Sequence, residues 1–137
     1  MFFGLDGLDT ANKSGWHRAA RQTTKEILVA TQKFTGVIPP VVVPDTEDHQ
    51  LDVASFERSI NRMIDAGVDG LFFLGSSGEV VFSTDERRRQ IIAEAVRIVD
   101  HRVPVLVGII DTETERVLAQ GKKAQALGAD ALVATCP

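Results

Sequence analysis

The strongest constraint on the fold is an alternation of short apolar runs with amphipathic helical segments. The runs 68–74 and 104–110 are almost wholly apolar, which is typical of parallel strands covered on both faces. Runs 37–43 and 129–135 have a similar character. The strand starts lie about 25 to 36 residues apart, the length of a βα unit. The pattern therefore predicts the order β-α-β-α-β-α-β.

Each predicted helix begins with a capping signal. Asp52 is placed to cap the first helix, and Ser83 or Thr84 to begin the second. Asp111 or Thr112 is expected to begin the third, and Ser83 and Thr112 each have a glutamate three residues later, as in a capping box. The predicted inward-facing positions are Phe56, Ile60, Met63, Ile64; Ile91, Ile92, Ala95, Val96, Val99; and Val117, Leu118, Gly121, Ala124, Leu127.

Two helix–strand junctions repeat each other. Residues 66–71 read Ala-Gly-Val-Asp-Gly-Leu, and residues 127–132 read Leu-Gly-Ala-Asp-Ala-Leu. In each junction a glycine, Gly67 or Gly128, is placed to end a helix in the left-handed conformation, and a strand follows at once. Repeated βα units of this kind fit either an open doubly wound sheet or half of a (β/α)8 barrel.

The segment after the second apolar run is the strongest candidate for a binding site. It reads Gly75-Ser76-Ser77-Gly78-Glu79. We expect Gly75 and Gly78 to shape the loop through positive φ. The hydroxyls of Ser76 and Ser77, with free loop N–H groups, suit a small anion such as a carboxylate. Glu79 is expected to brace the loop or the dipole of the following helix. An ordinary strand-to-helix turn is the alternative.

Composition excludes several classes of protein. The length of 137 residues allows one domain or less, and the net charge of −4 argues against non-specific nucleic-acid binding. No apolar run approaches the ~20 residues of a membrane span. The single cysteine, Cys136, cannot form an internal disulfide, which fits a reducing compartment and predicts a cytoplasmic location. We expect Cys136 to be a buried structural thiol.

The first 35 residues differ from the rest. Residues 1–35 are predicted to be a weakly structured N-terminal extension, as either a weak helix or a disordered arm, and residues 36–137 carry the fold. Acidic residues within the extension disfavour a targeting peptide. The histidines have no ligand spacing, so we expect them to be solvated and no metal to be bound: His17, His49 and His101. The basic triplet 87–89 is predicted to be a solvated helix face, with a phosphate or subunit contact as the alternative.

A set of spaced motifs runs through residues 36–137. They are Gly-Val-Ile-Pro at 36–39, Pro44 with its acidic turn, the 75–79 loop, Pro104-Val105, Gly108, the segment 126–130 and Thr135-Cys136-Pro137. Together they resemble the N-terminal half of the dihydrodipicolinate synthase / N-acetylneuraminate lyase family. Its members are class I, Schiff-base aldolases and lyases on a (β/α)8 TIM barrel.

This resemblance implies a function. The family's glycine loop binds the carboxylate of pyruvate or another 2-oxo acid, which gives that role to Ser76 and Ser77 and places Ser76 in a proton relay with family tyrosines. The reaction would be of the 4-hydroxy-tetrahydrodipicolinate synthase, N-acetylneuraminate lyase or 2-keto-3-deoxy sugar acid aldolase type. The resemblance implies no cofactor and no metal, and a homo-oligomer for the full-length form.

The chain departs from the family pattern at two loops. Val43-Pro44-Asp45 stands where many members have Thr-Pro-Phe, and residues 108–112 read Gly-Ile-Ile-Asp-Thr where many have Gly-Thr-Gly-Ala-Asn. Both differences lie near the expected mouth of the site. They leave sugar-acid aldolases open beside the synthase.

The catalytic groups of the family are also absent. The resemblance places the catalytic tyrosine and the Schiff-base lysine beyond Pro137, and this chain has no tyrosine. Its lysines lie before the barrel or on the outer side of the third helix: Lys13, Lys25, Lys33, Lys122 and Lys123. We therefore expect an N-terminal fragment that is inactive alone. A non-catalytic half-barrel interaction subunit and an open-sheet phosphate-binding domain are the alternatives.

Overall fold

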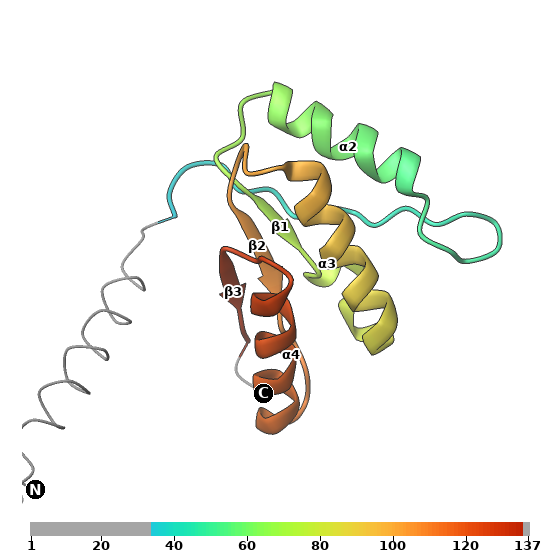
Figure 1. The fold of residues 1–137 in the computed structure, drawn as a ribbon, viewed down its shortest axis with the longest axis vertical. Coiled ribbons are helices and arrows are strands. Elements are labelled where there is room, and N and C mark those ends of the chain that lie inside the picture. The colour runs from blue at the N-terminus through green and yellow to red at the C-terminus, as the bar shows by residue number, and fades with distance from the viewer. Residues whose placement is uncertain (1–33, 136–137) are drawn as a thin grey trace, which may run out of the picture. The chain divides into compact units, whose positions relative to one another are not determined.

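The computed structural model describes residues 34–135, and its centre is a sheet of three parallel strands (Figure 1). Strands β1 (Leu71–Phe73), β2 (Val105–Gly108) and β3 (Ala131–Val133) pair in that order. The connecting elements are helices α2 (Val53–Asp65), α3 (Asp85–Val99) and α4 (Thr114–Ala126), and the short 3-10 helices η2 (Ser76–Gly78) and η3 (Val80–Phe82). Most of the predicted extension, with His17, and also Cys136, lie outside the described residues.

The strand order decides between the two sheet architectures. Each crossover moves to the next strand in the same direction, and parallel crossovers are right-handed. Helices α3 and α4 therefore lie on the same face of the sheet. A doubly wound sheet would instead reverse its strand order at a switch point. The described residues form part of a (β/α)8 barrel, as the sequence motifs imply.

The first predicted strand, 37–43, is irregular. The N–H of Val41 donates to the carbonyl of Phe72 at 2.8 Å, and the N–H of Phe72 donates to the carbonyl of Pro39 at 3.0 Å. One parallel bridge joins Pro40 to Phe72, and no longer ladder forms. The two prolines have no N–H to donate, so the segment lies beside β1 as an extended chain rather than a regular strand. Of the four predicted strands, the first is therefore this extended segment, and the other three are β1, β2 and β3.

The repeated junctions have the same structural role. The N–H of Asp69 donates to the carbonyl of Val37 at 2.9 Å, and its carboxylate accepts the N–H of Val37 at 2.7 Å. Asp130 makes the same pair of bonds with Val105, at 2.9 and 2.8 Å. Each aspartate thus fixes the start of its own strand to the start of the preceding one. This explains why the sequence repeats at these two places.

The predicted helix caps are confirmed for α2 and α3. The side chains of Asp52 and Thr84 accept the N–H groups three residues later, at 3.0 and 3.3 Å. Thr84 rather than Ser83 takes this role, so the capping-box pair beginning at Ser83 does not form. Gly67 and Gly128, with φ of +85° and +97°, follow the ends of α2 and α4 in the left-handed conformation.

The predicted start of α4 is wrong. The helix begins at Thr114, after a residue that provides no side-chain cap, because the carboxylate of Asp111 is bonded elsewhere. Its inward face also differs, since Leu118 is 54% exposed and Gln120 is buried in its place. Gln120 turns inward because it donates to a carboxylate of α3. The other predicted inward positions are buried or half-buried.

The core lies between β1, β2 and the helices. Phe56 of α2 contacts Phe73 of β1 edge to face, with ring centroids 5.8 Å apart. Both rings are fully buried, together with Ile60, Leu71 and Ile91. Burial of each such side chain contributes about 1.5–3 kcal/mol. This core holds the carboxyl ends of β1 and β2 together at one edge of the sheet.

We predict that Gly108→Ala destabilises the chain by about 3 kcal/mol or more, because overpacking against backbone cannot be relieved by a rotamer change. A Cβ at this position would lie 2.0 Å from the carbonyl oxygen of Leu74. Urea unfolding followed by circular dichroism measures the loss.

Gly67→Ala is the matched control. No atom outside residues 66–68 lies within 4 Å of the Cβ it would add, so only its positive φ opposes the change. A loss of about 1–2 kcal/mol is expected. An equal or smaller loss for Gly108→Ala would contradict the close contact between β2 and the loop.

Candidate functional site at the carboxyl end of the sheet

The predicted binding loop follows β1 directly. Ser76 and Ser77 occupy η2, and both are exposed. The first hydrogen bond of this turn runs from the N–H of Gly78 to the carbonyl of Gly75 at 3.0 Å. The N–H groups of Ser76 and Ser77 precede that bond and remain outside the turn. Two hydroxyls and two N–H groups thus stand together at the carboxyl edge of the sheet.

The loop glycines act by their small size rather than by positive φ, which corrects the sequence prediction. Gly75 has φ −83°, while the left-handed positions are Leu74 and Glu79, with φ of 55° and 53°. A Cβ at Gly75 would lie 2.6 Å from the ring of Phe72, and one at Gly78 would lie 3.4 Å from a backbone carbonyl. The glycines therefore allow the loop to approach its neighbours closely.

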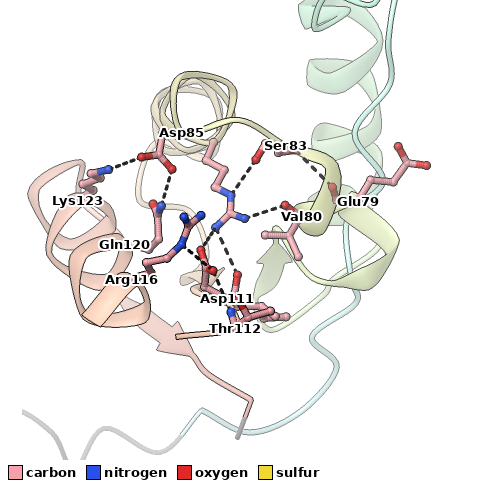
Figure 2. A network of polar contacts seen from close by, with 11 residues as sticks. Glu79, Val80, Ser83, Asp85, Asp111, Thr112, Arg116, Gln120 and Lys123 are labelled. Carbon is pink, nitrogen blue, oxygen red and sulfur yellow. Dashed lines mark hydrogen bonds and ion pairs between the residues drawn. The ribbon is translucent and has the colours of Figure 1, made fainter. Parts of the chain in front are cut away.

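Glu79 supports the loop through its backbone. Its carbonyl accepts the N–H of Phe82 at 3.0 Å and the hydroxyl of Ser83 at 3.4 Å. Its side chain is exposed and points away from the surrounding polar network (Figure 2). The predicted bracing role thus belongs to the main chain of Glu79 rather than to its carboxylate.

A polar cleft of about 250 Å³ lies beside the loop. Arg87 of α3 forms an ion pair with Asp45 in this cleft and donates to the carbonyl of His49 at 3.5 Å. These contacts connect the acidic turn after the first segment to the start of α3. The lining residues are Val43, Asp45, His49, Gly78, Glu79, Phe82, Ser83 and Arg87.

Arg88 contradicts the prediction of a solvated basic triplet. It is only 7% exposed, and its guanidinium donates to three carbonyls: Val80 at 3.0 Å, Ser83 at 3.2 Å and Ile110 at 3.3 Å. The sequence contains a signal for this burial, because position 88 continues the buried helical stripe of Ile91. Arg89 does lie at the surface, where it bonds Glu86.

Asp111 belongs to the same network, and Figure 2 shows it beside Thr112 and Arg116. Its Oδ1 accepts the N–H of Thr112 at 2.8 Å and the Nε of Arg116 at 2.9 Å. Its Oδ2 is buried without a hydrogen-bond partner and lies 3.8 Å from Nη1 of Arg88. The Thr112 N–H, and then the positive charges of Arg116 and Arg88, lower the pKa of Asp111.

A second polar link joins α3 to α4. Asp85 accepts hydrogen bonds from Lys123 at 2.8 Å and Gln120 at 2.6 Å, and these two bonds lower its pKa. Lys122 and Lys123 are exposed, as predicted from the helix periodicity. Neither lysine is therefore the buried amine that imine chemistry requires.

Three other features within residues 34–135 bear on possible sites: the histidines, groups of possible metal ligands, and helices that could span a membrane. His49 and His101 are exposed, as expected. Among the described residues, no group of three or more His, Cys, Asp or Glu side chains is arranged to hold a metal ion. No helix in this part of the chain is both long and apolar enough to span a membrane.

Comparison with known proteins gives a consistent family match. The protein-family model described as "Dihydrodipicolinate synthetase family" matches residues 33–137 of the chain. "Probable 2-dehydro-3-deoxy-D-pentonate aldolase YjhH" of Escherichia coli K12 is 42% identical over 106 residues, which cover 77% of this chain and 35% of the relative. A 4-hydroxy-tetrahydrodipicolinate synthase of Salinibacter ruber is 40% identical over 104 residues, covering 76% of this chain and 34% of the relative.

The fold is also similar to solved structures. The crystal structure of YagE from E. coli K12, a prophage protein of the dihydrodipicolinic acid synthase family in complex with pyruvate, matches with a TM-score of 0.72 and 46% identity. That match covers 74% of this chain and 34% of YagE. The chain spans about a third of the length of the curated relatives it matches.

We predict that Asp111→Asn lowers stability at neutral pH, and that the difference from the wild type narrows in acid. The folded-state pKa of Asp111 lies below its ordinary value of 3.8, so its ionic contacts stabilise the fold above about pH 4. This contribution is lost as pH falls through the lowered pKa. Urea midpoints from pH 7 to pH 2.5 measure the change.

Asp48→Asn, which removes an exposed carboxylate from the 45–51 turn, is the control, and its urea midpoints should match those of the wild type. A difference between wild type and Asp111→Asn that stays constant through this range would contradict the ionic role of Asp111.

Proposed function

Because the chain belongs to the dihydrodipicolinate synthetase family, we propose that it is part of an aldolase or lyase that acts on pyruvate or a related 2-oxo acid through a Schiff base. Its contribution to that enzyme is the carboxylate-binding loop. The observation that carries the proposal is the exposure of Ser76 and Ser77 at the carboxyl edge of the sheet, where the active sites of (β/α)8 barrels lie.

The chemistry of the loop suits a carboxylate. Each serine hydroxyl can donate one hydrogen bond to the carboxylate, and the adjacent backbone N–H groups are further neutral donors. Hydrogen bonds to an ionised carboxylate are stronger than those between neutral groups. The hydroxyl of Ser76 can also accept a proton while it donates one, which suits its proposed place in a proton relay.

The proposed Schiff base requires a lysine that residues 34–135 do not provide. Lys122 and Lys123 are exposed on α4, and Lys123 is already bonded to Asp85. We therefore propose that the 137-residue chain alone binds the 2-oxo acid but does not form the imine. In the complete enzyme the lysine and the relay tyrosine would come from the part of the barrel that this chain does not span.

The proposal covers two substrate types. One is a 2-dehydro-3-deoxy sugar acid, as in the name of the pentonate aldolase relative, and the other is the substrate pair of a 4-hydroxy-tetrahydrodipicolinate synthase. The polar cleft that contains Asp45 and Arg87 supports a hydroxylated substrate, because both side chains can bind hydroxyl groups. We place the complete enzyme in the cytoplasm, as a homo-oligomer.

A non-catalytic half-barrel is the second candidate. It is favoured by the outer edge of β3, which has no further strand beside it in the described sheet, and by Leu132, which is 44% exposed there. Size-exclusion chromatography separates the two candidates. A folded dimer that does not bind pyruvate supports the half-barrel subunit, whereas a folded monomer that binds pyruvate supports part of an enzyme.

We predict that pyruvate causes saturable shifts of the Ser76 and Ser77 amide resonances in the 15N-labelled chain. Replacement of either serine by alanine removes a hydrogen bond to a charged group and should weaken binding about tenfold. NMR titration measures the affinity. Ser59→Ala, in α2, should bind as the wild type does. Unchanged affinity in both loop variants would refute the carboxylate site.

We also predict that the 137-residue chain gives no covalent product with pyruvate and borohydride. Reduction would trap an imine at any lysine with a lowered pKa, and the exposed lysines of α4 lack the burial that lowers it. Intact-mass spectrometry with and without borohydride makes the test. A stoichiometric adduct at one lysine would overturn the proposed inactivity of the chain alone.

A further inference from the structure

We propose that Arg88 is a positioning residue for the Ser76–Ser77 site, because its buried guanidinium fixes the loop after β1 to the carboxyl end of β2. This inference rests on the proposed carboxylate role of the loop. Arg88 does not line the exposed serine surface, so its effect reaches the ligand through the loop and not by contact.

The three bonds of Arg88 join two separate loops. The carbonyl of Val80 lies at the start of η3, and the carbonyl of Ser83 lies just after its end. Only Glu79 separates η3 from η2, which contains the two serines. The third carbonyl, of Ile110, lies two residues beyond the end of β2. A planar guanidinium with fixed donor directions can hold such a set of acceptors in one geometry (Figure 2).

The loop needs this external support because the bond that joins its two short helices is long. Gly78 bonds Gly75 within the first turn, and Phe82 bonds Glu79 within the second, both at 3.0 Å. Between the two turns, the N–H of Val80 reaches the carbonyl of Gly75 only at 3.5 Å. Leu74 and Glu79 both hold positive φ, a conformation that non-glycine residues adopt at an energetic cost. Strained positions of this kind persist only where surrounding contacts hold them. Arg88 supplies two such contacts from outside the loop, to the carbonyls at the start and the end of its second turn, Val80 at 3.0 Å and Ser83 at 3.2 Å.

Asp111 makes the buried charge tolerable. A guanidinium that is 7% exposed requires a compensating negative charge, and Asp111 supplies one at 3.8 Å. Arg116 holds the other oxygen of this carboxylate from the exposed side. The neighbouring Arg89 makes no such link, since its guanidinium bonds Glu86 within the same helix. Arg89 therefore offers a matched control.

The test compares Arg88→Met, Arg88→Lys and Arg89→Met in the 15N-labelled 137-residue chain. Amide hydrogen exchange is measured for the hydrogen-bonded amides within residues 76–83, against α2 as an internal reference: Gly78, Glu79, Val80, Phe82 and Ser83. Pyruvate affinity is measured from the Ser77 amide shift. For Arg88→Met we expect exchange in 76–83 to rise at least about tenfold, with α2 unchanged, and pyruvate affinity to fall about tenfold.

The lysine variant and the control sharpen the result. Arg88→Lys keeps the charge and can reach fewer carbonyls, so both effects should be intermediate. Arg89→Met should match the wild type in both readouts. If Arg88→Met does not fold, Arg88→Lys decides the question, since local loosening of 76–83 with weaker binding is still required of it.

Two results would overturn the inference. One is wild-type pyruvate affinity in an Arg88 variant, and the other is exchange that rises equally in α2 and in 76–83, which would mean a role in overall stability alone. Failure of the proposed function gives a different pattern. In that case the wild type shows no saturable pyruvate shift, while the Arg88 variants still loosen residues 76–83.

Discussion

The parallel register of β1 and β2 is the constraint on which the candidate site depends. Leu71 lies opposite Val105 and Phe73 opposite Val107, so the carboxyl ends of both strands reach the same edge of the sheet. At that edge the backbone of Gly108 touches the carbonyl of Leu74, and this contact sets where the serine loop begins. A slip of register would break the contact and turn the inward side chains of β1 outward.

Each end of the sheet has its own link between successive βα units. At the amino ends, Asp69 and Asp130 bind both the N–H and the carbonyl of the first residue of the preceding strand. At the carboxyl ends, Arg88 joins η3 to the chain that follows β2, and Asp111 balances its charge. The first link sets register, and the second sets the shape of the loops.

Much of the fold was predictable because its signals are local. The helix caps at Asp52 and Thr84 and the terminating glycines depend on contacts within a few residues, and the prediction for them is confirmed apart from the choice between Ser83 and Thr84. The resemblance to the family is likewise confirmed by the match of residues 33–137. The wrong predictions involve distant partners. Helix α4 begins later than predicted because the carboxylate of Asp111 bonds Arg116. Gln120 faces inward where Leu118 was predicted to, because Gln120 donates to Asp85.

The sequence alone determined the alternation of strands and helices, the place of Ser76 and Ser77 in the loop after an apolar strand, and the family. Apolar periodicity, capping residues and motif spacing are all properties of short stretches. Only the tertiary structure decided that the loop glycines serve close approach and that Arg88 is buried. The physical reason is the same in both cases. A Cβ clash with a neighbouring ring and a guanidinium's choice of carbonyls depend on atoms brought together by the sheet, and no local pattern of residues specifies them.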